Sequence, residues 1–261
     1  MALSYSQLQL YRTCPKQYEF AVVKKIPRQI SAGESFGSSV HNTLKKWGEK
    51  EMENGKLKMK NDQQTLFEES KSIFNFQFSI LELLNLWHSS FIVEGYESRL
   101  EADFARRRGE RLLTNFYEWW QREPRTVLAV EKGFKVPMND TTISGRFDRV
   151  EQEEEGVHVI DFKTSTPKSQ DEVDADLQLS IYAIASEESL GQPCTKLTML
   201  YLNEDALVER TTARSSGQMR DAQKQILSLC EQLEEKDYHP TPSREKCRAC
   251  PYRGVCSASA I

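Results

Sequence analysis

Two β-branched runs, residues 143–148 and 157–163, flank a polar segment, and this pattern constrains the fold more than any other in the sequence. Such runs, separated by turn residues, predict an antiparallel hairpin. If Asp148 lies opposite Asp161, the centre of the turn falls within the polar residues between the runs. The sequence therefore predicts two carboxylates that face each other across the hairpin, with Cβ atoms about 5 Å apart.

Like charges that face each other destabilise a hairpin, and a divalent cation between them reverses that effect. Carboxylate oxygens suit the hard ions Mg²⁺ and Mn²⁺. Lys163 shares one strand face with Asp161, so a cation and an ammonium could act together on a phosphodiester. The alternative is an exposed hairpin with an ordinary Asp–Lys ion pair. The apolar neighbours Val159, Ile160 and Phe162 favour the buried metal site.

Three further polar residues lie on predicted helices. His41 borders the apolar face of a helix predicted over 36–51, as either a core histidine or a third metal ligand. Gln178 and Tyr182 are four residues apart on a helix predicted over 175–186, so they share a face. They could contact a phosphate or a nucleotide edge, although spacing alone favours an ordinary amphipathic helix.

The cysteines of the C-terminal tail predict a metal site. Cys247, Cys250 and Cys256 lie in a segment that contains Pro and Gly, and a Cys-x2-Cys pair followed by a third cysteine is a strong signal. Three thiolates need a fourth ligand, for which Cys14 and His239 are the candidates. Four thiolates suit either zinc or an iron–sulfur cluster.

Composition excludes several classes of protein. With 38% hydrophobic and 28% charged residues, the chain is typical of a soluble globular protein. No apolar run of about 18 residues and no signal peptide are visible, so we expect no membrane segment and a cytoplasmic location. The net charge of -4 restricts any DNA contact to a local basic patch, and Arg106 to Arg108 form the densest basic cluster.

The remaining pattern predicts a helical N-terminal half followed by a strand-rich core. The other helices are expected over residues 4–11, 66–89, 97–122 and 217–236. The strands are expected over residues 126–138, 141–151, 157–163, 197–203 and 206–212.

Together these motifs resemble the RecB-like branch of the PD-(D/E)XK nucleases, which includes the nuclease domains of RecB and AddB and the CRISPR-associated RecB-like exonucleases. The resemblance spans nearly the whole chain. It is carried by residues 3–18 around Cys14, Gly37-x3-His41, Gly145-Arg-Phe-Asp148, Asp161-Phe-Lys163, Gln178-x3-Tyr182 and the three C-terminal cysteines.

The resemblance implies an α/β fold with a restriction-endonuclease-like mixed β-sheet flanked by helices. It implies one nuclease domain over 1–261, with a largely helical region at 36–122 and a catalytic core at 126–236. Residues 1–20 and 238–261 would form the iron–sulfur region.

The resemblance also implies roles for individual residues. Asp148, Asp161 and Lys163 would be catalytic. His41, both aspartates and the Phe162 carbonyl would bind Mg²⁺ or Mn²⁺. Gln178 and Tyr182 would contact the substrate. Cys14, rather than His239, would join Cys247, Cys250 and Cys256 around a [4Fe–4S] cluster. Glu131 matches an acidic position of the family, although a surface glutamate is the simpler interpretation.

The implied activity is a metal-dependent DNA exonuclease that acts on single strands or ends in repair or recombination. Its partners would be DNA and a helicase or a CRISPR-adaptation protein, since the sequence contains no Gly-x4-Gly-Lys-Ser/Thr nucleotide loop. One alternative is a nuclease that trims DNA ends during CRISPR adaptation. The non-enzyme alternative is an iron–sulfur DNA-binding module that partners a helicase.

Overall fold

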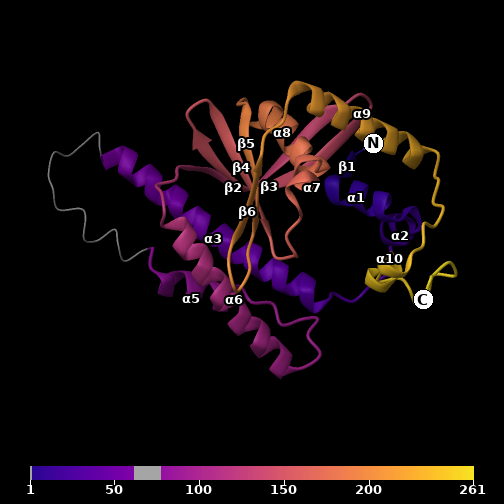
Figure 1. Ribbon diagram of the computed structural model, residues 1–261, viewed down its shortest axis with the longest axis horizontal. Helices are drawn as coiled ribbons and strands as arrows, with labels where there is room; N and C mark the ends of the chain where they lie inside the picture. The colour runs from indigo at the N-terminus through magenta and orange to yellow at the C-terminus, as the bar shows by residue number, and fades with distance from the viewer. Residues whose placement is uncertain (1, 62–77) are drawn as a thin grey trace.

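The computed structural model describes residues 2–61 and 78–261 (Figure 1). The strands are β1 (Ala2–Ser4), β2 (Val127–Met138), β3 (Thr141–Glu153), β4 (Gly156–Lys163), β5 (Cys194–Tyr201) and β6 (Val208–Thr212). The helices are α1 (Tyr5–Thr13), α2 (Pro15–Tyr18), the π-helix η1 (Glu19–Val23), α3 (Ala32–Asn61), α5 (Ile80–Ser90), α6 (Arg99–Trp120), α7 (Gln170–Asp174), α8 (Leu177–Leu190), α9 (Ser216–Glu234) and α10 (Arg244–Ala249).

In the described part of the chain, the strands form one mixed sheet in the order β1-β3-β4-β5-β6, and β2 pairs with β3. The β2–β3 and β3–β4 pairs are antiparallel, whereas β4 and β5 are parallel. In the β3–β4 pair, Arg149 lies opposite Ile160 and Glu153 lies opposite Gly156, so the turn falls at Glu154 and Glu155. The register predicted for this hairpin is therefore confirmed.

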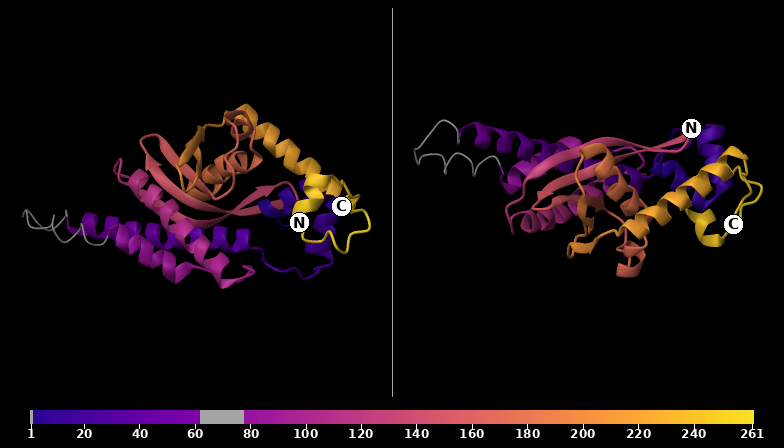
Figure 2. Two further views of the ribbon diagram at one scale, coloured as in Figure 1. Left: turned by 60° about the horizontal axis from the view of Figure 1, so that its bottom comes forward. Right: turned by 90° about the horizontal axis from the view of Figure 1, so that it is seen from above.

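Helices cover both faces of the sheet, as the left view of Figure 2 shows. One core joins the sheet to α8 and α9, and includes Val157 and Val159 of β4. The other joins it to α3, α5 and α6, and includes Ile160 and Phe162. Because β4 is buried on both faces, its sequence does not alternate between apolar and polar residues, and the polar residues His158 and Asp161 are buried with the apolar ones. The predicted restriction-endonuclease-like α/β architecture is confirmed.

The predicted helix bounds were wrong in places. Helix α3 begins at Ala32, not at residue 36, because Ser31 and Glu34 cap it reciprocally: the backbone N–H of each donates to the side chain of the other. The same helix continues through Asn61, beyond the predicted end at 51. The helix predicted over 66–89 lies partly outside the described residues. The helix predicted over 175–186 is α8, which begins at Leu177 because the Asp176 side chain caps it, and which continues to Leu190. The short helix α7 that precedes it was not predicted.

The two ends of the chain lie side by side (Figures 1 and 2). The Tyr11 hydroxyl donates to the Asp237 carbonyl at 2.7 Å, and the Tyr252 hydroxyl donates to the Ile26 carbonyl at 3.3 Å. At the N-terminus, β1 pairs in parallel with β3. The sequence pattern did not predict β1. No described helix is both long and apolar enough to cross a membrane.

Gly109→Ala tests how tightly the helical layer is packed. A Cβ at Gly109 of α6 would lie 2.0 Å from Cζ2 of Trp87 on α5, which is fully buried. We expect the substitution to lower the free energy of unfolding by about 1–3 kcal/mol through overpacking. Gly55→Ala is the control, because no atom lies within 4 Å of its Cβ position. It should stabilise α3 or leave it unchanged in urea denaturation. Equal effects of the two variants would contradict the close packing.

Candidate functional site

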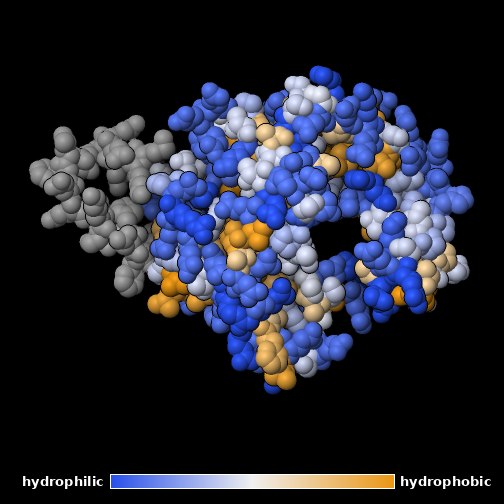
Figure 3. Space-filling model, viewed as in Figure 1, coloured by the Kyte–Doolittle hydropathy of each residue, from blue (hydrophilic) through white to orange (hydrophobic). Residues whose placement is uncertain are grey.

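A cleft of about 650 Å³ opens where β2, β3 and β4 meet α1, α3 and α8. Figure 3 shows an opening through the molecule, and by comparison with Figure 1 it lies between the sheet and the paired ends of the chain. The lining of the cleft includes every residue predicted to be catalytic, together with the other predicted polar candidates: His41, Glu131, Asp148, Asp161, Lys163, Gln178 and Tyr182.

Three carboxylates occupy neighbouring strands at the base of this cleft. Glu131 of β2 falls opposite Asp148 of β3, because the residues before and after it, Val130 and Lys132, pair with Arg149 and Phe147. One step beyond the last β3–β4 pair, the register places Asp148 opposite Asp161. There the backbone N–H of Phe162 donates to Asp148 Oδ2 at 2.8 Å. The Asp148 side chain thus takes the place of a strand partner at the end of the β3–β4 ladder.

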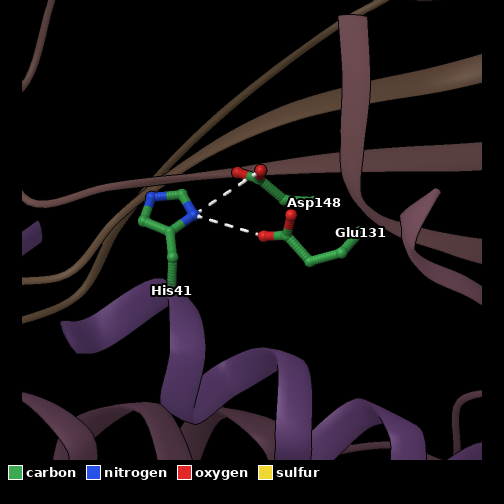
Figure 4. A group of neighbouring side chains, drawn as sticks. All are labelled: His41, Glu131 and Asp148. Carbon is green, nitrogen blue, oxygen red and sulfur yellow. Dashed lines mark ion pairs between the residues drawn. The ribbon is translucent and has the colours of Figure 1, made fainter. Parts of the chain in front are cut away.

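Helix α3 brings His41 to two of these carboxylates (Figure 4). His41 Nδ1 lies 3.5 Å from Asp148 Oδ1 and 3.9 Å from Glu131 Oε1. Donor atoms of the three residues all lie within 4.8 Å of one another. One imidazole nitrogen and two carboxylates are a donor set that fits a divalent cation of the Mg²⁺ or Mn²⁺ type.

The electrostatics of His41 reflect the same neighbours. Burial lowers the pKa of His41, but Asp148 and Glu131 outweigh burial and raise this pKa to about 10. A cation that binds the imidazole must displace its proton, so metal binding is coupled to proton release.

The sequence favoured an ordinary surface role for Glu131. Its φ of 47° is left-handed, which is uncommon for a residue other than glycine and rare inside a strand. Its carboxylate also accepts a hydrogen bond from Arg146 Nη1 at 3.1 Å. A signal for its position was present, because a β2–β3 hairpin that turns at Asn139 and Asp140 places Glu131 opposite Asp148.

The remaining candidates form a closed ring of one ion pair and three hydrogen bonds. Lys163 Nζ lies 2.6 Å from Asp161 Oδ2 and donates to Gln178 Oε1 at 2.9 Å. Gln178 Nε2 donates to the Tyr182 hydroxyl at 2.8 Å, which donates to Asp161 Oδ1 at 3.0 Å. The shared face of α8 therefore points at Asp161. Tyr182 is only 3% exposed, and its predicted contact with the substrate stays a prediction.

Burial and the ion pair between Asp161 and Lys163 together govern the ionisation of this ring. Burial raises the pKa of Asp161, with Lys163 opposing and Asp148 reinforcing that shift. Burial lowers the pKa of Lys163, but Asp161 outweighs burial and the pKa of Lys163 is raised. The ammonium of Lys163 is thus kept charged by the carboxylate beside it.

Cys14, Cys247, Cys250 and Cys256 line one small pocket of about 30 Å³ between the two ends of the chain. His239 does not line it. Tetrahedral zinc with Zn–S bonds of about 2.3 Å would need sulfurs about 3.8 Å apart. Within residues 2–61 and 78–261, the only group of such donors within 4.8 Å is the one at His41, so the thiols are not at zinc spacing. Burial raises the pKa of Cys14, but hydrogen bonds from Thr241 outweigh it and the pKa is lowered.

The basic cluster on α6 does not line the cleft. Arg106 donates to Asp103 at 3.2 Å, and Arg108 pairs with Glu204 at 3.0 Å. Arg107 stacks on Phe104 of the same helix. The predicted role of these arginines in DNA binding stays a prediction. Lys163 supplies an ammonium group to the lining of the cleft.

Comparison with known proteins yields one family. The model of the PD-(D/E)XK nuclease superfamily matches residues 2–257. No curated protein matches the sequence. A solved structure from Eubacterium rectale, described as a candidate exonuclease, aligns with a TM-score of 0.50 and 11% identity over 100% of this chain and 91% of that chain. SSO0001 aligns with a TM-score of 0.40 and 16% identity over 79% of this chain and 95% of that chain, a score too low to carry an argument. At these identities the likeness concerns the fold alone.

Glu131→Gln tests the metal site. Because the carboxylate supplies one of three converging donors, its loss should weaken Mn²⁺ binding about tenfold or more, as measured by calorimetry without substrate. Glu155→Gln, in the exposed β3–β4 turn, is the matched control and should bind Mn²⁺ like the wild type. Equal affinities of the two variants would remove Glu131 from the site.

Proposed function

The chain belongs to the PD-(D/E)XK nuclease superfamily, and from this premise we propose that it is a Mg²⁺- or Mn²⁺-dependent DNA exonuclease of the RecB-like branch, active in repair or recombination. The observation that carries the proposal is the convergence of His41, Glu131 and Asp148 within 4.8 Å, in one cleft with Lys163. Beside DNA, the proposed partners are a helicase or a CRISPR-adaptation protein.

Each residue has a distinct part in the proposed hydrolysis. His41, Glu131 and Asp148 would hold the cation, and Asp161 faces the same cleft from β4. A cation held by these residues would supply Lewis-acid activation of a phosphate oxygen and of a water molecule. The Lys163 ammonium would orient the attacking water and offset charge that develops on the phosphate. Gln178 and Tyr182 keep Lys163 and Asp161 in place through the hydrogen-bonded ring.

The shape of the cleft supports a single strand or a strand end as the substrate. The lining comes from α1, α3 and the end of β4, which border the opening seen in Figure 3. An opening enclosed by the chain on all sides admits a strand through its end, whereas an internal position of a rigid duplex cannot enter from the side. This geometry favours exonuclease over endonuclease activity in the proposal.

A neighbouring groove supports a polymeric substrate. This groove of about 310 Å³ shares Asn42 with the cleft and contains Lys45, Lys46 and Glu49. Asn42, Lys45, Lys46 and Glu49 follow one another along one face of α3. Ammonium groups neutralise phosphates, so a strand bound in the cleft would gain contacts by continuing along this face.

We further propose a [4Fe–4S] cluster held by Cys14, Cys247, Cys250 and Cys256. The four thiols line one pocket at a spacing wider than one zinc ion requires. Cys14 lies near one end of the chain and the other three near the opposite end, so the cluster would close almost the whole chain into a loop. A crosslink over so long a loop contributes on the order of 5 kcal/mol in a chain-entropy estimate.

Lys163→Ala and Asp161→Ala test the nuclease. Each removes a charged group from the cleft, so we expect cleavage of end-labelled single-stranded DNA with Mn²⁺ to fall about 100-fold or more. Chelator should abolish the wild-type activity. Lys224→Ala, on the exposed side of α9, is the control and should cleave normally. Wild-type rates from a folded Lys163→Ala or Asp161→Ala protein, as judged by circular dichroism, would refute the assignment.

Substitution of Lys45 and Lys46 together by Gln tests the path of the strand. Two lost phosphate contacts to a single strand should lower the slope of log KM against log salt by about 1.4 and leave kcat unchanged. Glu49→Gln, in the same groove, should act in the opposite direction and tighten binding, because it removes a like charge. An unchanged salt slope in the double variant would exclude this groove from the path.

Cys14→Ala tests the cluster. We expect loss of iron, a lower melting temperature and reduced solubility, because the substitution opens the long loop. His239→Ala is the control and should keep its iron, because His239 does not line the pocket. Iron, sulfide and zinc are measured after anaerobic purification. One zinc per chain without sulfide would replace the cluster with a zinc site and leave the nuclease proposal standing.

A further inference from the structure

An ion pair with two parallel hydrogen bonds lies buried between α3 and β3, outside the catalytic cleft. Arg149 Nη1 donates to Glu51 Oε2 at 2.5 Å, and Nη2 donates to Glu51 Oε1 at 3.0 Å. The Arg149 side chain is 1% exposed and that of Glu51 is 8% exposed. Burial of two charges is costly, and comparable apolar packing would often be at least as stable. The pair therefore calls for an explanation other than stability.

Further contacts satisfy the remaining atoms of the pair. Arg149 Nε donates to Glu151 Oε1 at 2.6 Å, and Arg125 Nη1 donates to Glu151 Oε2 at 3.1 Å. Trp120 Nε1 donates to Glu51 Oε1 at 2.6 Å. The network joins α3, β3 and the end of α6, and it continues from Arg125 to the exposed Glu123 at 2.7 Å and from Glu151 to the buried His158 at 3.6 Å. Two parallel hydrogen bonds from the planar Arg149 guanidinium leave the Glu51 carboxylate little freedom to shift or rotate.

Two strand residues that α3 contacts lie next to metal-site carboxylates. Arg149 directly follows Asp148, and Val130 directly precedes Glu131. Val130 and Arg149 face each other across the β2–β3 ladder. Helix α3 rests on this pair: a Cβ at Gly48 would lie 2.4 Å from Val130 Cγ1 and 3.7 Å from Arg149 Nη1.

The same helix carries His41, ten residues before Glu51. A helix rises about 1.5 Å per residue, so the anchored end and the ligand are about 15 Å apart on one rigid rod. The direction of the two Glu51–Arg149 hydrogen bonds and the close packing at Gly48 together determine the position of the N-terminal part of α3, which carries His41. They therefore set the 3.5 Å separation between His41 Nδ1 and Asp148 Oδ1.

We propose that Arg149 and Glu51 are positioning residues, which align α3 on the β2–β3 hairpin so that His41 completes the metal site formed by Glu131 and Asp148. This inference rests on the proposed metal-dependent function. Apolar contacts alone would permit small translations of α3 along the sheet, and each would move His41 away from the carboxylates. The buried fork discriminates against those translations, because they break both of its hydrogen bonds.

The test measures Mn²⁺ affinity by calorimetry without substrate, with thermal unfolding of the same samples. Glu51→Gln and Arg149→Lys remove the two-sided fork, and each should weaken Mn²⁺ binding about tenfold or more. Glu151→Gln is the matched control. It perturbs the same buried network with a comparable loss of thermal stability, but the fork to α3 survives. Its Mn²⁺ affinity should stay within about twofold of the wild type.

A second pair of variants tests alignment without a change of charge. Gly48→Ala pushes α3 away from Val130 and should weaken Mn²⁺ binding. Val130→Ala added to Gly48→Ala removes the clashing Cγ1 and should restore the affinity.

Wild-type Mn²⁺ affinity in Glu51→Gln, Arg149→Lys and Gly48→Ala would overturn the positioning role and leave the metal site intact. Equal loss in Glu151→Gln would also overturn it, because the network would then act through general stability. Failure of the proposed function looks different: Asp148→Asn would bind Mn²⁺ as well as the wild type, or the wild type would bind none.

Discussion

The structure depends on the antiparallel pairing of three strands that places Glu131, Asp148 and Asp161 in one row. Three adjacent carboxylates repel one another in the interior of a protein, and a sheet that aligns them needs positive charge nearby. The chain supplies it from two sides. His41 approaches from α3 toward Glu131 and Asp148, and Lys163 lies beside Asp161. One part of the row, Glu131 and Asp148 with His41, is thus a candidate site for a divalent cation, and the other part is paired with an ammonium group.

The two helical layers have different relations to this row. Helix α8 supports it through side chains, since Tyr182 and Gln178 connect Asp161 to Lys163. Helix α3 supports the row of carboxylates as a rigid body, because its N-terminal part contributes His41 and Glu51, in a later turn, is bound by Arg149. The buried charges between α3 and β3 are paired and hydrogen-bonded at most of their polar atoms, which limits the free-energy cost of burying them.

The cysteine pocket is separate from the row, and its chemistry is separate as well. Soft thiolates gather where the two chain ends meet, whereas the cleft presents oxygen and imidazole donors. The ends also meet through hydrogen bonds and ring contacts, among them Phe20 with Tyr252. Because α1 borders the cleft, the same junction that joins the ends also completes the wall around the site.

Local pattern alone determined the β3–β4 hairpin and its register, because a polar turn centred on Glu154 and Glu155 aligns Asp148 with Asp161. It also determined the cysteine set as a metal candidate. Only the tertiary structure decided that His41 lies beside Asp148 and not in the core, because that depends on where α3 lies against β3. The place of Glu131 was implicit in the Asn139–Asp140 turn, but no local pattern indicated its left-handed backbone. Arg149 and Glu51 are far apart in sequence, so no periodicity could pair them, and it is their contact that determines how the helix meets the sheet.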